Sequence, residues 1–97
     1  MSELPLAAQL APEEPYVRYM NGYVLGASRH LEESVAELHK AIELEPYYPL
    51  PYILLGRVEE TRGKGKEAEA AYQQFLDHAA AHDAQREFAK ARLVEIR

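Results

Sequence analysis

The sequence contains no cysteine, which excludes disulfides, thiolate nucleophiles and cysteine-ligated metals, and is in keeping with a reducing compartment. It also lacks any run of 18 uncharged apolar residues, the length that a membrane-spanning helix requires. Residues 1–10 have neither the positive start nor the apolar stretch of a signal peptide. These absences predict a cytoplasmic protein that makes no contact with a membrane.

Positive charge is scarce, with 11 lysines and arginines against 16 acidic residues and a formal net charge of −5. The basic residues are scattered and form no stripe that could follow a phosphate backbone, so nucleic acid is not expected as a partner. Hydrophobic residues make up 47% and charged residues 28% of 97 residues, which is typical of one globular domain.

Motifs for catalysis and for cofactors are missing too. None of the three serines and one threonine lies in a Gly-x-Ser-x-Gly turn. Residues 63–66, Gly-Lys-Gly-Lys, lack the preceding strand and the spacing of a phosphate-binding loop. His78 and His82 are four residues apart on a predicted helix, but no third ligand accompanies them, so solvated histidines are favoured over a metal site. We therefore predict a protein that is not an enzyme and has no cofactor and no metal.

The sequence resembles itself at an offset of 34 residues, and the matches fall at helix ends and at apolar positions. The matching pairs are Pro12 and Pro46, Pro15 and Pro49, Gly22 and Gly56, Val24 and Val58, Leu4 and Leu38, Ala7 and Ala41, and Leu10 and Leu44. Two similar units in succession are therefore expected.

Apolar residues at steps of three and four, bounded by proline and glycine, predict five helices and no strand. The expected ranges are 16–28, 31–44, 50–61, 66–80 and 84–97, which pair as antiparallel hairpins followed by a last helix. Asp83 is the expected N-cap of the last helix. In that helix we expect partial burial of Phe88, Ala91, Leu93 and Ile96.

The second unit has Leu55, Gly56, Ala68 and Tyr72, and the first has Gly22, Leu38, Ala41 and Pro46. With the 34-residue period, these residues resemble the consensus of the tetratricopeptide repeat family, in which glycine and alanine let paired helices approach. The resemblance implies an all-α, right-handed superhelical array of antiparallel helix hairpins with a C-terminal capping helix. The implied layout is a partial repeat at 1–14, repeats at 15–48 and 49–82, and the capping helix at 83–97.

Several positions depart from this consensus. Asn21 stands for a leucine, Ser34 for an alanine, Arg18 for a bulky aromatic residue and Phe75 for the second alanine. Ala80 stands for the terminal proline, so the helix over 66–80 could continue through the alanines that follow, or be exchanged between chains.

The resemblance also implies where a partner binds, because the first helix of each repeat lines the concave groove of such arrays. On the first helix this face carries Tyr16, Tyr19, Met20 and Tyr23, while Val17, Val24 and Leu25 are expected to point into the hairpin. The next helix adds Leu50, Ile53, Leu54 and Arg57. The positions from which some relatives clamp a terminal carboxylate hold Tyr19, Tyr23 and Leu54, so that mode is not expected.

Three tyrosines offer about 450 to 750 Å² together, at roughly 150 to 250 Å² each, which rivals the largest apolar patch of a typical monomer. We therefore predict a protein-interaction module that binds an apolar or aromatic peptide or helix. One alternative is a structural domain that forms homo-oligomers through the same patch. Others are a patch covered by the N-terminal segment or the last helix, and a non-catalytic regulatory fragment of a larger protein.

Overall fold

The computed structural model describes residues 14–97, which form helices and no strand. The helices are α2 (Pro15–Ala27), α3 (Leu31–Leu44), α4 (Leu50–Thr61), α5 (Gly65–His78) and α6 (Gln85–Ile96). The prediction of an all-α domain is confirmed. The partial repeat predicted for residues 1–14 lies, apart from Glu14, outside the described residues.

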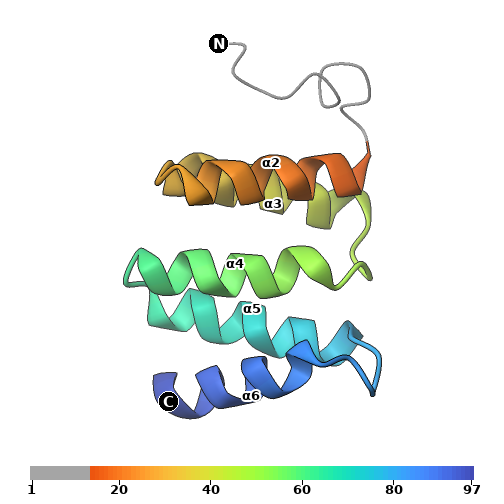
Figure 1. The fold of residues 1–97 in the computed structure, drawn as a ribbon, viewed down its shortest axis with the longest axis vertical. Coiled ribbons are helices and arrows are strands. Elements are labelled where there is room, and N and C mark those ends of the chain that lie inside the picture. Colours follow the sequence, from red (N-terminus) through yellow and green to blue (C-terminus); the bar gives the residue numbers. More distant parts are fainter. Residues whose placement is uncertain (1–13) are drawn as a thin grey trace.

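The helices pack in the order of the chain. Each helix from α2 to α5 contacts the next one, and a smaller contact joins α2 to α4. In Figure 1 they lie as successive layers, with α2 and α3 above α4, α5 and α6. No helix of residues 14–97 is long and apolar enough to cross a membrane.

The ends of most helices lie where proline and glycine predict them. Helix α2 begins at Pro15, whose missing N–H needs no partner in the first turn. Helices α3 and α4 have the predicted bounds. The prediction that the helix after Lys66 extends to Ala80 is wrong, because α5 ends at His78 and Ala79 has an extended ψ of 148°.

Two contacts from the following segment explain this earlier end. Arg86 Nη1 donates hydrogen bonds to the carbonyls of Leu76 at 2.8 Å and Ala79 at 3.3 Å, which satisfies oxygens that a longer helix would use. The N–H of Gln85 donates to Asp83 Oδ1 at 2.8 Å, so Asp83 caps the start of α6 as its side chain predicts.

Two glycines bring the helices of each hairpin into close contact. A methyl group on Gly22 would lie 2.7 Å from the Leu38 side chain, and one on Gly56 would lie 2.6 Å from the Tyr72 ring. Only hydrogen fits at these two positions. Leu38 and Tyr72 are both fully buried, so each hairpin closes on one large side chain.

The core consists of two adjoining clusters. The cluster between α3 and α4, which α5 completes, contains Leu38, Leu54, Leu55, Val58 and Ala71. The cluster between α4, α5 and α6 contains Tyr52, Ile53, Ala68, Tyr72, Phe75, Ala89 and Leu93. Ala41 is also fully buried, whereas Pro46 is exposed in the turn that follows α3.

Three predictions of burial are wrong. Phe88 is 42% exposed and Ala91 is exposed, because α6 packs through the face that carries Ala89 and Leu93. Val24 is 48% exposed, although Val58 at the corresponding position of α4 is buried. Val58 faces Gly26 of the preceding hairpin, and no helix among residues 14–97 lies on the corresponding side of α2.

Candidate functional site

Helix α2 carries more apolar surface than α3 covers. Tyr16 is 54% exposed, Tyr23 50% and Met20 37%. Tyr19 lies half-buried beside them, with its ring centroid 6.0 Å from that of Tyr16. We call Tyr16, Tyr19, Met20 and Tyr23 the tyrosine face. All four residues predicted for it on α2 contribute, and their spacing of three and four residues places them on one side of the helix.

The tyrosine face continues onto the turn before α4. The Tyr19 ring meets Tyr48 edge-on, with centroids 6.3 Å apart. Burial raises the pKa of the Tyr19 hydroxyl, and the neighbouring Tyr23 and Tyr16 raise it further, while Arg57 lowers it. Burial likewise raises the pKa of Tyr48. These hydroxyls therefore stay neutral near pH 7 and can donate or accept hydrogen bonds at the edge of an apolar surface.

On α4, the predicted binding residues divide between the core and the surface. Ile53 is 3% exposed and Leu54 9%, so both pack inside the domain, and Ile53 offers a partner almost nothing. Leu50 is half-buried and Arg57 is exposed. The difference from the prediction arises because α4 is covered from both sides, by the hairpin before it and by α5 and α6 after it.

A cavity of about 210 Å³ opens at one end of the tyrosine face, between the C-terminal halves of α2 and α4. Its lining residues are Tyr23, Gly26, Ala27, Arg29, Leu31, Leu54, Arg57, Val58 and Thr61. The charged residues among them are Arg29 and Arg57, and no acidic residue lines the cavity. The site therefore combines an aromatic surface with a positively charged end in a protein of formal net charge −5.

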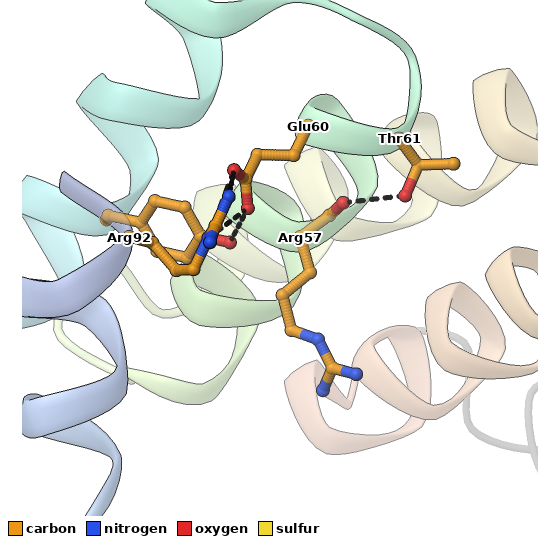
Figure 2. Close-up of polar contacts among 5 residues, drawn as sticks. Arg57, Glu60, Thr61 and Arg92 are labelled. Carbon is orange, nitrogen blue, oxygen red and sulfur yellow. Dashed lines mark hydrogen bonds and ion pairs between the residues drawn. The ribbon is translucent and has the colours of Figure 1, made fainter. Parts of the chain in front are cut away.

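Arg57 is held at the edge of this cavity without an acidic partner among residues 14–97. Its guanidinium carbon lies 5.8 Å from the centre of the Phe88 ring, an arrangement that favours a cation. The hydroxyl of Thr61 donates to the Arg57 carbonyl at 3.0 Å. Figure 2 shows the Arg57 side chain extending away from the Glu60 carboxylate, which is occupied by Arg92.

The occupied carboxylate attaches α6 to the preceding hairpin. Glu60 Oε1 accepts hydrogen bonds from the Tyr72 hydroxyl at 2.7 Å and from Arg92 Nε at 3.1 Å (Figure 2). The bond from Arg92 is the main reason that the pKa of Glu60 is lowered, despite partial burial. Burial and the Glu60 carboxylate raise the pKa of Tyr72. This group is structural, and it fixes the helix that presents Phe88 to Arg57.

Arg29 was not among the predicted site residues, but it has an uncommon backbone. Its φ is +68°, in the left-handed region that favours glycine. The turn after α2 closes with hydrogen bonds from Arg29 N–H to the Gly26 carbonyl and from His30 N–H to the Leu25 carbonyl. The turn after α4 is closed in the same way around Gly63, whose φ is +78°. The offset of 34 aligns these two positions, so the sequence already marked an arginine where glycine is expected.

The histidine pair has no metal-binding geometry. His78 is the last residue of α5 and His82 lies beyond it in a turn, so the two do not share a helix face. The His78 ring instead packs beside those of Tyr47 and Tyr52, at centroid distances of 5.4 and 5.3 Å. Residues 14–97 contain no group of three or more side chains that could hold a metal ion.

A buried polar group in the first hairpin was also not foreseen. Arg18 Nη1 donates to Glu37 Oε1 at 2.8 Å, and Asn21 Nδ2 donates to the same oxygen at 3.3 Å. Asn21 is 1% exposed, and its Oδ1 atom accepts no hydrogen bond. The corresponding positions 34 residues later hold Tyr52, Leu55 and Ala71, so this group replaces an apolar contact and does not line the site.

These features are described without the help of relatives. No family model matches the chain, and no curated protein is significantly similar to it.

Proposed function

We propose that this protein is a tetratricopeptide-type interaction module without catalytic activity, and that the tyrosine face binds an apolar or aromatic segment of another protein. The proposal has two parts, the repeat architecture and the binding role. Each part is supported by different residues and can be tested separately.

Agreement between the two hairpins supports the repeat architecture. Helix α3 (Leu31–Leu44) and helix α5 (Gly65–His78) each have 14 residues, and both ends differ by 34. The contact of Gly22 with Leu38 recurs as that of Gly56 with Tyr72, again 34 residues later. Helix α6 begins 35 residues after α4, close to where the first helix of a third unit would begin. Regular stacking of such units gives a superhelical array with a concave side.

One observation carries the binding role, namely the exposure of Tyr16, Met20 and Tyr23 side by side on α2. An aromatic side chain contributes roughly 150 to 250 Å² of surface, and clustered exposed aromatics mark interaction sites. Tyrosine is among the residues that most often dominate binding energy, because it joins a rigid apolar ring to a hydroxyl. The half-buried Tyr19 anchors this surface to the domain.

The binding role is tested by selecting peptides of twelve residues from a random displayed library on the full chain. The best peptide is then titrated by fluorescence anisotropy. We expect Tyr16→Ala with Tyr23→Ala to weaken binding at least tenfold, because both rings are half exposed and their loss spares the core. Val94→Ala on α6 is the matched control, since Val94 is 76% exposed and lies outside the tyrosine face. Equal binding by the double variant and the control would refute the proposal.

Self-association is the second candidate, because an exposed aromatic face can also meet its own copy across a two-fold axis. Light scattering after size exclusion measures it directly. A dimer that grows with concentration and disappears in the variant with Tyr16→Ala and Tyr23→Ala would favour this role. A monomer at every concentration would exclude it.

A further inference from the structure

The cavity at the end of the tyrosine face is lined by two arginines and by no acidic residue. No ion pair joins Arg29 or Arg57 to a carboxylate within the described part of the chain. Other arginines of the domain are paired: Arg62 with Glu59, Arg92 with Glu60 and Arg97 with Glu69. The two arginines beside the aromatic surface are thus available to a charge that comes from outside.

Arg29 is present where the backbone works against it. The left-handed conformation at φ +68° is unfavourable for a residue with a Cβ atom, and the matching turn uses Gly63. Strained residues of this kind are concentrated at functional sites. Glycine at position 29 would give the same turn without strain, so the side chain of Arg29, and not the turn, accounts for the arginine.

Arg57 occupies a surface that is otherwise apolar. It lies on the α4 side of the cavity, opposite Tyr23 and Ala27 of α2, and its guanidinium rests near the Phe88 ring. A guanidinium backed by an aromatic ring still has its N–H groups free to meet a carboxylate in a two-pronged contact.

We infer that this cavity is a carboxylate subsite, in which Arg29 and Arg57 bind an aspartate or glutamate side chain of the peptide whose apolar residues lie on the tyrosine face. The inference rests on the proposed function, because it adds a charged position to the same partner. Charge complementarity argues for this occupant, since an acidic protein with a formal net charge of −5 places two unpaired arginines at the end of its aromatic surface. The preferred ligand is therefore an acidic amphipathic peptide.

A different role for the two arginines is stabilisation of the C-terminal ends of α2 and α4, where cations are favourable. The two roles predict opposite results for Arg29→Gly. If Arg29 serves the helix end, this variant is less stable and binds peptide normally. If Arg29 serves the ligand, the variant has a higher Tm, because the strained position becomes a glycine, and it binds peptide more weakly.

The experiment uses the full chain and a random library of peptides of twelve residues with blocked termini, so that no terminal carboxylate is present. Selection on the unchanged protein should enrich aspartate or glutamate beside aromatic and aliphatic residues. Selection on Arg57→Glu should replace the acidic residues by lysine or arginine, and the exposed position of Arg57 keeps this variant folded. The best acidic peptide should lose at least tenfold in affinity for Arg57→Glu, and the same peptide with its acidic residue changed to lysine should regain it.

The outcomes separate this inference from the function on which it rests. Peptides that need Tyr16 and Tyr23 but show the same charge preference on both proteins would overturn the carboxylate subsite and leave the interaction module intact. Selection that succeeds only with free C-terminal carboxylates would overturn the assignment to an acidic side chain. Failure to select any peptide that depends on the tyrosines would overturn the proposed function itself.

Discussion

Substitution of Gly56 by alanine tests the packing on which the second hairpin depends. A methyl group at this position would lie 2.6, 2.7 and 2.8 Å from three atoms of the Tyr72 ring. The ring cannot move aside easily, because Tyr72 is fully buried and its hydroxyl donates to Glu60 at 2.7 Å. Overpacking of a core costs about 1 to 3 kcal/mol, and the rigid ring favours the upper end.

Alanine also brings a gain, since it favours a helix by about 1 kcal/mol over glycine. The net loss in the free energy of unfolding should therefore be about 2 kcal/mol, or a decrease in Tm of about 10 °C for a domain of this size. Urea denaturation followed by far-UV circular dichroism measures it. Gly65→Ala is the matched control, because its methyl group would meet Ile96 at an ordinary 3.7 Å, and its stability should change by less than about 0.5 kcal/mol.

A double-mutant cycle identifies the cause. Tyr72→Leu removes most of the ring that the new methyl group meets, so Gly56→Ala should cost about 1 kcal/mol less in that background. Equal costs in both backgrounds, or a Gly56→Ala protein as stable as the Gly65→Ala control, would show that close helix contact does not require glycine at position 56.

Three further predictions concern the first hairpin, the attachment of α6 and the second turn. Glu37→Ala should lower stability by about 3 kcal/mol, because breaking a buried pair leaves its partners unsatisfied, and adding Arg18→Tyr with Asn21→Leu should restore most of it; a triple variant no more stable than the single one by denaturation would contradict this. The pKa of Glu60 is lowered in the folded state, so its contribution to stability is full above the ordinary pKa of glutamate and is lost as the pH falls through the lowered value. Denaturation from about pH 7 to pH 3 should therefore show a shallower acid loss for Glu60→Gln, and an unchanged slope would exclude this role. Gly63→Ala should lower the unfolding free energy by about 1 kcal/mol through its φ of +78°, because no neighbour within 4 Å opposes the methyl group; thermal denaturation checks this, and an unchanged Tm would rule it out.

Local signals in the sequence were sufficient for most of the fold. Proline at the starts of α2 and α4, and the glycine turn before α5, fixed helix ends that depend on backbone chemistry alone. The end of α5 could not be predicted in this way. The alanines after His78 favour helix, and the helix stops because Arg86, from the following segment, donates to the carbonyls of Leu76 and Ala79.

The candidate site was predictable where exposure follows from one helix and not where it depends on neighbours. The tyrosine face follows from the spacing on α2, which is covered on one side. The burial of Ile53 and Leu54 depends on how far α6 and the preceding hairpin reach over α4, and no periodicity gives that distance. Arg29 could have been found from its alignment with Gly63, had the turns been compared as closely as the helices.

Packing in the order of the chain has a further consequence for folding and for mechanics. Contacts between neighbouring helices are close in sequence, so the domain should fold fast, within microseconds to milliseconds, and its hairpins can open one at a time from either end. Helix α2 is attached to the rest chiefly through α3, with a small contact to α4. A ligand that spans α2 and α4 would act as a splint across this joint, and its binding should appear as slower hydrogen exchange in the first hairpin.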